Sequence, residues 1–211
     1  MQKDVKNLRV SYEKERFDIS DADPSPIQQF SNWFEKATQL GEFEANAMLL
    51  STVSADGKPS ARMMLLKEFG QKGFVFFTNY ESRKGKEIAH NPNACITFWW
   101  APLEKQVRIE GILEKVSAEE SDAYYYSRPQ GSQAGAIASA QSTVIESREW
   151  LEKKFDEIMH REKLQRPANW GGFILKPKVM EFWQGRPNRL HDRLRYSLQE
   201  NGNWIIERLS P

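Results

Sequence analysis

Residues 47–67 read AMLLSTVSADGKPSARMMLLK, and this stretch sets the fold class of the chain. An apolar run over residues 47–53 is followed by Asp56-Gly57 and by a second run that ends at Lys67. An Asp-Gly pair between two apolar runs is typical of the tight turn of a β-hairpin. The stretch therefore predicts two antiparallel strands.

The same pattern of short apolar runs separated by turn residues continues toward the C-terminus. Asn201-Gly202 marks a tight turn between the last two runs. The predicted strands cover residues 73–78, 94–100, 106–116, 172–175, 179–183, 195–199 and 204–208.

Helices interrupt these strands. Residues 24–41 predict an amphipathic helix that Ser25 caps and Gly41 ends. Residues 118–127 predict a second helix, where Ser117 and Glu120 fit a capping box, and residues 145–162 predict a third. We expect a mainly β, α+β fold in which an antiparallel barrel carries helices. A mobile arm over residues 1–20 precedes one predicted domain at 21–211.

Composition excludes several classes of function. Lys and Arg number 30 against 29 Asp and Glu, so no global field draws in nucleic acid or an anionic membrane. A single cysteine allows no internal disulfide and suits a reducing cytoplasm, where we expect the protein. Three histidines and one cysteine form no cluster with zinc-ligand spacing, so no metal site is predicted. No apolar run has membrane-spanning length.

Basic residues beside apolar or aromatic strands are the remaining candidates for chemistry. They form separated groups that could bind phosphates, although any single Lys or Arg is more often a solvated residue or an ion-pair partner. In an extended strand Arg62 and Lys67 face opposite ways, so they would serve different neighbours. The groups are Arg62 with Lys67, Arg83 with Lys84, Arg128, and Arg189 with His191 and Arg193.

Taken in order, seven motifs resemble those of pyridoxine/pyridoxamine 5'-phosphate oxidases. The resemblance runs from about Leu8 to the terminal ERLSP. The motifs are RMMLLK at 62–67, FFTNYESRKGK at 76–86, QVRIEG at 106–111, SRPQGSQ at 127–133, WGGF at 170–173, EFWQG at 181–185 and NRLHDR at 188–193.

This resemblance implies a split β-barrel homodimer that binds two FMN molecules where the subunits meet. The implied cofactor-binding residues are Arg62, Met63, Met64, Leu65, Leu66, Lys67, Phe77, Thr78, Arg83, Lys84, Gln106, Gln141, Ser142, Trp183 and Arg193, with Arg83 and Lys84 on the FMN phosphate. The implied substrate-binding residues are Arg9, Tyr12, Lys67, Tyr124, Arg128, Ser132, Arg189, Leu190 and His191.

The resemblance also implies the reaction. Pyridoxine 5'-phosphate or pyridoxamine 5'-phosphate would lose a hydride from C4' to the flavin and become pyridoxal 5'-phosphate, the last step in making this cofactor. O2 would be the acceptor and H2O2 a product, with NH3 released from the amine substrate. Arg189 and His191 would be the catalytic residues, holding the ring.

Three other interpretations remain open on the sequence alone. Another flavin oxidoreductase on the same barrel would keep the FMN motifs without combining SRPQGSQ and NRLHDR. A non-catalytic carrier of FMN or pyridoxal phosphate would use nearly the same residues. A nucleic-acid module would use Arg83-Lys84 and nearby aromatic residues, but the near-neutral charge disfavours it.

Overall fold

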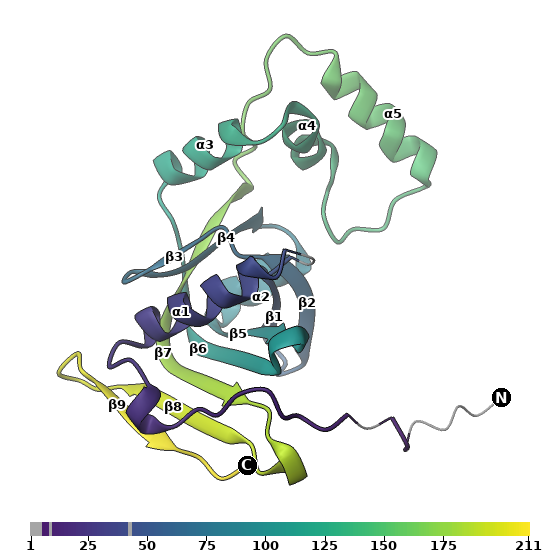
Figure 1. Cartoon of the computed structure of the whole chain (residues 1–211). Helices are drawn as coiled ribbons and strands as arrows, with labels where there is room; N and C mark the ends of the chain where they lie inside the picture. The colour runs from purple at the N-terminus through teal and green to yellow at the C-terminus, as the bar shows by residue number, and fades with distance from the viewer. Residues whose placement is uncertain (1–5, 9, 42–43) are drawn as a thin grey trace. The chain divides into compact units, whose positions relative to one another are not determined.

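The computed structural model describes residues 6–8, 10–41 and 44–211 (Figure 1). In this part of the chain nine strands form one sheet. The strands are β1 Ala47–Val53, β2 Pro59–Leu65, β3 Glu68–Gly70, β4 Gly73–Asn79, β5 Asn93–Trp100, β6 Lys105–Lys115, β7 Trp170–Gln184, β8 Asp192–Leu198 and β9 Trp204–Arg208.

The sheet has the order β2-β1-β5-β6-β7-β4-β3, with β8 paired to β7 and β9 paired to β8. β4 runs antiparallel to β3 and to β7, and β8 runs antiparallel to β7 and to β9. Helices accompany the strands, so the predicted α+β class is confirmed. The helices are α1 Pro26–Gln39, α2 Arg83–His90, α3 Ala118–Ser127, α4 Gln130–Ala138 and α5 Arg148–Met159, with short 3-10 turns η1 Ile19–Asp21, η2 Ala101–Leu103 and η3 Pro187–Arg189.

Local signals placed the starts of α1 and α3 correctly. The Ser25 side chain accepts a hydrogen bond from the Gln28 amide and caps α1. Ser117 and Glu120 form the predicted capping box at α3. The third predicted helix, 145–162, is shorter in the structure: Ser147 caps α5, which begins at Arg148 and ends at Met159.

The local structure differs from the prediction in three places. The strands predicted at 172–175 and 179–183 are one strand, β7. Pro177 lies between the part of β7 that pairs with β4 and the part that pairs with β8, so its missing N–H removes no hydrogen bond to either strand. No helix was predicted at residues 130–138, but they form α4. The strand β3 was not predicted, because three residues carry too little pattern.

The chain forms two compact units, and the sheet strands β1, β5, β6 and β7 each contribute residues to both. The first unit comprises the described residues up to Met48, together with Ile96–Glu110 and Pro177–Pro211. The second comprises Leu49–Cys95 and Gly111–Lys176. The boundaries predicted from the sequence, an arm at 1–20 and one domain at 21–211, stay a prediction.

Aromatic side chains build the core of the first unit. Phe30 of α1 is fully buried and lies 5.1 Å from Phe98, measured between ring centroids. Trp33, one helical turn on, lies 5.3 Å from Phe182 in an edge-to-face arrangement. The buried polar groups of such rings have partners, since Trp100 Nε1 donates to the Ala45 carbonyl at 2.9 Å. The core therefore fixes α1 against β5 and β7.

The second unit has a smaller apolar cluster beside its strands. Ala134 and Ala138 on α4 are buried with Ile158 on α5, and Phe155 packs against them. Small alanines let the two helices approach closely, so α4 forms although its sequence favours a turn. Figure 1 shows α4 and α5 side by side.

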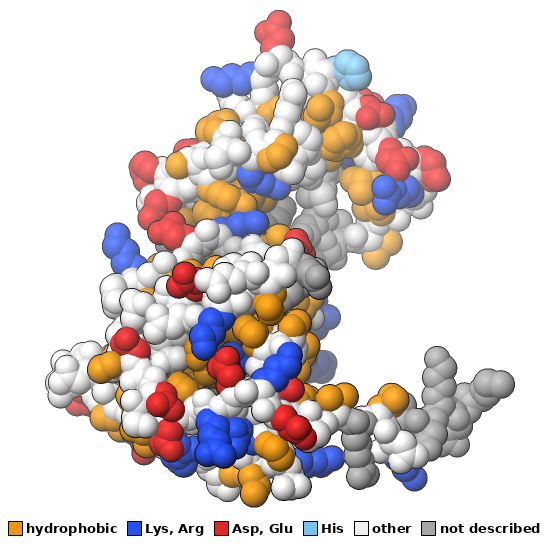
Figure 2. Space-filling view, in the orientation of Figure 1, with side chains coloured by type: hydrophobic (Ala, Val, Ile, Leu, Met, Phe, Trp, Pro, Cys, Tyr) orange, Lys and Arg blue, Asp and Glu red, His pale blue; other side chains and the backbone are white. Residues whose placement is uncertain are grey.

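The surface matches the balanced composition. On the face drawn in Figure 2, Lys and Arg side chains lie among Asp and Glu. In the described residues, no helix combines the length and apolar character needed to cross a membrane.

Replacing Phe30 with alanine should lower the free energy of unfolding by about 3–5 kcal/mol, because the cavity left among Phe34, Phe98 and Trp100 cannot collapse. Urea unfolding followed by tryptophan fluorescence measures the change. Val144→Ala is the matched control, since the Val144 side chain is 100% exposed. Equal midpoints for the two variants would contradict this account of the core.

Candidate functional site

The predicted site residues fall into two groups, one in each compact unit. Ten of those in the second unit line one cavity of about 680 Å³, a volume in the usual range for small-molecule sites. They are Met63, Met64, Leu65, Lys67, Phe77, Thr78, Tyr124, Arg128, Ser132 and Gln141. Predicted residues separated by up to 78 positions, from Met63 to Gln141, thus meet in one place.

Arg128 supplies one cationic wall of this cavity. Its guanidinium lies over the Trp170 ring, 4.7 Å from the ring centroid. Tyr124 stacks on Phe77 with ring centroids 4.0 Å apart, which completes an aromatic surface beside it. The Arg128 Nη1 atom is buried and has no hydrogen-bond partner in the described structure. A buried cationic donor left in this state is suited to an anionic ligand.

Lys84 supplies a second cation at the start of α2. Ser82 caps this helix by accepting from the Gly85 amide. A side chain at Gly85 would place its Cβ 2.0 Å from the Tyr80 carbonyl oxygen, so glycine lets the helix start lie directly against the end of β4. The backbone of α2 therefore holds Lys84 beside Thr78.

The Lys84 ammonium is buried among neutral oxygens. The side chain is 6% exposed, and its Nζ lies 3.1 Å from Thr78 Oγ1, 3.0 Å from Gln141 Oε1 and 3.3 Å from Ser82 Oγ. In the described residues no carboxylate lies within ion-pair distance of it. Burial, followed by the charge of Arg62, lowers the pKa of Lys84 to about 8. Such an ammonium favours a ligand that brings negative charge.

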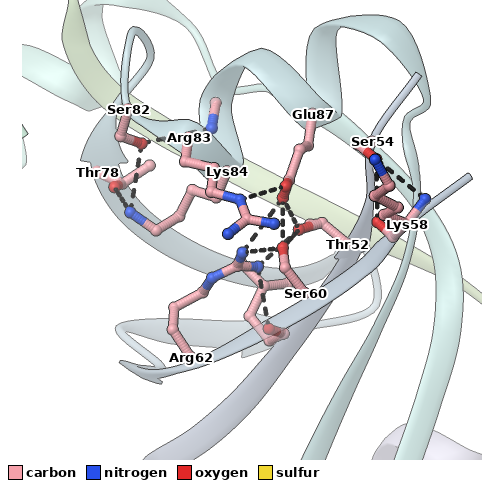
Figure 3. A network of polar contacts seen from close by, with 12 residues as sticks. Thr52, Ser54, Lys58, Ser60, Arg62, Thr78, Ser82, Arg83, Lys84 and Glu87 are labelled. Atoms are coloured by element: carbon pink, nitrogen blue, oxygen red, sulfur yellow. Dashed lines mark hydrogen bonds and ion pairs between the residues drawn. The ribbon is translucent and has the colours of Figure 1, made fainter. Parts of the chain in front are cut away.

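Arg62 and Arg83 meet at one buried carboxylate, Glu87 (Figure 3). Arg62 Nη2 lies 3.2 Å from Glu87 Oε2, while Arg83 Nε donates to Oε1 at 2.9 Å. Arg62 Nη1 also donates to Thr52 and to the Leu50 carbonyl, so its terminal nitrogens are engaged with the protein. In contrast, 64% of the Arg83 side chain is exposed.

Arg83 borders a second hollow of about 560 Å³, which Ser142 and Gln141 also line. Gln141 lines both hollows, and its side chain accepts from Lys84 and from Thr78. The predicted separation of Arg62 and Lys67 is consistent with this arrangement. Lys67 lines the first cavity, whereas Arg62 lies in the Glu87 network.

Two predicted residues of the first unit, Tyr12 and Trp183, lie beside His191. Trp183 lies 4.5 Å from the His191 ring and 5.8 Å from the Tyr12 ring, measured between centroids. A side chain at Gly185 would meet Tyr12 at 2.7 Å, so glycine makes room for the tyrosine. Glu13 and Lys14 donate backbone hydrogen bonds to the Glu104 carboxylate, which holds this part of the chain in the unit.

His191 is held in its neutral form. Its Nδ1 accepts from the Arg186 amide at 3.1 Å, which places the ring proton on Nε2. Burial lowers the pKa of His191, and the charges of Arg189 and Arg193 lower it further. The Nε2 donor is therefore present at neutral pH.

The flanking arginines differ in their surroundings. Arg193 donates from Nε and Nη2 to the Glu181 carboxylate at 3.0 and 3.1 Å, a bidentate pair. Arg189 ends η3 with a positive backbone φ of 63°, next to Asn188 at 58°. Two consecutive non-glycine residues in the left-handed region are strained, which is a common feature of functional sites. Leu190 is 68% exposed.

Some predicted residues lie elsewhere, and some site residues were not predicted. Leu66 is buried and does not line the cavity, Gln106 lies half-buried on β6, and Arg9 lies outside the described residues. Trp170, Trp99 and Glu87 had no assigned role. Trp170 stands in the quoted WGGF motif, but no local signal shows that it stacks on Arg128. In the described residues no group of His, Cys, Asp and Glu could hold a metal ion.

Comparisons with known proteins agree over the whole chain. A family profile described as pyridoxamine 5'-phosphate oxidase matches residues 35–161, and one described as the pyridoxine 5'-phosphate oxidase C-terminal dimerisation region matches residues 170–211. Curated relatives named pyridoxine/pyridoxamine 5'-phosphate oxidase include one from Gloeothece citriformis, 53% identical over 100% of both chains. Another, from Bordetella petrii, is 54% identical over 98% of this chain and 99% of its own.

Solved structures agree with the fold. PhzG from Burkholderia lata, in complex with tetrahydrophenazine-1-carboxylic acid, superposes with a TM-score of 0.87 at 30% identity, over 91% of this chain and 95% of its own. A pyridoxamine 5'-phosphate oxidase-related, FMN-binding protein from Nostoc punctiforme has a TM-score of 0.75 at 17% identity, over 90% of this chain and 100% of its own. The predicted split-barrel fold is thus confirmed.

Inorganic phosphate should bind the cofactor-free protein more weakly as the pH rises through about 8, because Lys84 loses its charge there. Calorimetric titration between pH 7 and 9 measures this affinity. Lys84→Gln should bind weakly at every pH and lose this dependence, whereas Lys72→Gln, at an exposed position outside the cavity, should behave as wild type. A wild-type affinity that stays constant to pH 9 would contradict the assignment.

Proposed function

The chain belongs to the pyridoxamine 5'-phosphate oxidase family, and we propose that it oxidises pyridoxine 5'-phosphate and pyridoxamine 5'-phosphate to pyridoxal 5'-phosphate with FMN as cofactor. O2 is the electron acceptor and H2O2 a product, with NH3 released from the amine substrate. This is the last step in forming the vitamin B6 cofactor. The site of action is the cytoplasm, as the single cysteine suggests.

One observation carries this proposal: a single cavity collects residues of the motifs RMMLLK, FFTNYESRKGK and SRPQGSQ. Met63, Met64 and Thr78 line it from the first two motifs, and Arg128 and Ser132 line it from the third. The donor chemistry fits two phosphorylated ligands. Lys84 is a buried ammonium held by neutral oxygens, and Arg128 has a buried nitrogen without a partner in the described structure.

We assign the FMN phosphate to Arg83 and Lys84. The exposed guanidinium of Arg83 offers a planar fork, and the Lys84 ammonium offers a point charge. Arg62 contributes positive charge and no direct hydrogen bond to the phosphate, because its terminal nitrogens already donate within the protein. Gln141 and Ser142 line the same hollow as Arg83 and would donate to the remaining phosphate and ribityl oxygens.

We assign the substrate phosphate to Lys67, Tyr124, Arg128 and Ser132, and the substrate ring to Arg189 and His191. FMN, when bound, would supply the redox chemistry, as the acceptor for a hydride from C4' of the substrate and the route for the electrons to O2. The protein positions the substrate: neutral His191 donates from Nε2, and Arg189 places positive charge near the ring. Tyr12, beside His191, covers the ring.

The active protein is a homodimer with FMN at the subunit interface. The family profile that matches residues 170–211 is described as a dimerisation region, which supports the dimer. That region holds Trp183, Arg189, His191 and Arg193. The cavity with Lys67 and Arg128 lies in the other compact unit.

An absorption spectrum of the purified protein tests cofactor, substrate and acceptor together. Pyridoxine 5'-phosphate added without oxygen should bleach the flavin bands near completely, and air should restore them while H2O2 accumulates. A bound flavin that resists bleaching would indicate a carrier. Bleaching by other reductants alone would indicate a different flavin oxidoreductase of the same fold.

Arg128→Ala should weaken binding of pyridoxal 5'-phosphate by about 100-fold or more while FMN stays bound, because the lost guanidinium faces the substrate phosphate. Titration of the purified variant, followed by absorbance, measures both ligands. Arg148→Ala, an exposed arginine on α5, is the control. Loss of flavin from Arg128→Ala would move this residue to the cofactor.

Arg189→Ala should lower kcat/KM for pyridoxine 5'-phosphate by a factor on the order of 10², through lost orientation and lost charge at the ring. Steady-state H2O2 production measures the effect, again with Arg148→Ala as control. FMN content should not change. An unaltered kcat/KM would remove Arg189 from the catalytic group.

A further inference from the structure

Glu87 lies among the cationic residues of the phosphate site without a role in the proposed function. It sits on α2, four residues after Arg83, and is 5% exposed. Its carboxylate accepts hydrogen bonds from Thr52 Oγ1 at 2.5 Å and Ser60 Oγ at 2.7 Å, besides those from Arg62 and Arg83. Figure 3 shows these side chains converging on it from β1, β2 and α2.

The carboxylate is kept charged by these partners. Burial alone would raise the pKa of Glu87, but the hydrogen bonds from Thr52, Ser60 and Arg83 and the charge of Arg62 lower it to about 2. A buried carboxylate with this many donors is fully ionised at neutral pH. Its position is also rigid, because the donors come from three separate elements.

The two carboxylate oxygens of Glu87 accept hydrogen bonds from different partners. Oε2 accepts from Thr52, Ser60 and Arg62, which are buried or half-buried, so these contacts anchor the carboxylate. Oε1 accepts from Arg83 Nε. A guanidinium held at Nε keeps its two terminal nitrogens available as donors, and Arg83 lines the adjacent hollow. Without this grip the exposed Arg83 side chain would sample many rotamers.

We infer that Glu87 is a positioning residue for the FMN phosphate. Glu87 orients Arg83 for bidentate contact with the phosphate, and its negative charge reduces the net charge of Arg62, Arg83 and Lys84 from +3 to +2, which balances a phosphate dianion. The inference rests on the proposed function, since it assumes FMN at this site. Arg62, Arg83 and Lys84 contribute three positive charges and Glu87 one negative charge. A phosphate monoester carries about −1.5 to −2 at neutral pH.

Two effects of removing the carboxylate oppose each other. Glu87→Gln adds net positive charge, which attracts a phosphate, but the added attraction is weakened by water around the exposed Arg83. The glutamine amide keeps only one acceptor oxygen and places an NH2 group next to a guanidinium, so either Arg83 or Arg62 loses its hydrogen bond to residue 87. We expect the loss of orientation to exceed the gain in charge.

Titration of the cofactor-free protein with FMN and with riboflavin, followed by flavin fluorescence, tests this inference. Glu87→Gln should raise the Kd for FMN at least 10-fold and change the Kd for riboflavin, which lacks the phosphate, less than 2-fold. Glu68→Gln, at an exposed glutamate of β3, should leave both unchanged. A general structural defect would weaken both ligands equally, and that result would overturn the inference, as would unchanged or tighter FMN binding.

The route through Arg83 has its own test. In an Arg83→Ala background, Glu87→Gln should change the Kd for FMN less than 3-fold, because no guanidinium remains to orient. Multiplicative effects of the two substitutions would overturn the inference. If Glu87→Gln does not fold, Thr52→Val removes one anchor of the carboxylate and should raise the Kd for FMN, but not for riboflavin, by about 3-fold. Equal Kd values for FMN in Thr52→Val and wild type would contradict the role.

These outcomes separate the two proposals. If the wild-type protein binds neither flavin, the proposed FMN-dependent activity fails. If it binds FMN and Glu87→Gln binds FMN equally well, only the role of Glu87 fails.

Discussion

The burial of the Lys84 ammonium is the constraint around which the start of α2 and its neighbours are organised. Taking an ammonium out of water is costly, and neutral oxygens of Thr78, Ser82 and Gln141 offset only part of that cost. The lowered pKa of Lys84 reflects the part of the desolvation cost that these oxygens do not offset. The fold keeps the charge in place because α2 begins tight against the Tyr80 carbonyl, where only glycine fits at position 85. An anionic ligand recovers part of the cost that the folded chain carries.

Buried carboxylates organise the arginines in both compact units. Glu87 holds Arg62 and Arg83 in the second unit, and Glu181 holds Arg193 in a bidentate pair in the first. Each carboxylate is nearly inaccessible to water. Long flexible side chains thereby become fixed groups before any ligand arrives, which reduces the entropy lost on binding. The same contacts keep the local excess of positive charge small, in line with the balanced composition of the chain.

Around His191, aromatic packing holds the functional side chain in place. Trp183 and Tyr12 border its ring, and the Arg186 amide fixes its tautomer. Tyr12 reaches this position because the backbone at Glu13 and Lys14 is tied to Glu104. A histidine in these surroundings is a neutral donor at neutral pH, whereas an exposed histidine would be partly charged. Orientation and protonation state are therefore set by the same contacts.

The sequence by itself determined the α+β class, most strand positions, the capped starts of α1 and α3, and the motifs that place the chain in its family. These features depend on residues within a few positions of one another, which a pattern records. The tertiary structure decided what Glu87 and Trp170 do, since Glu87 contacts Thr52 across 35 positions and Trp170 lies under Arg128 across 42. It also decided that α4 is a helix, because α5 packs against it. It decided that β7 is continuous as well, because Pro177 pairs with neither β4 nor β8 and its missing N–H breaks no hydrogen bond to them. Burial and long-range contact create these properties, and neither exists until the chain has folded.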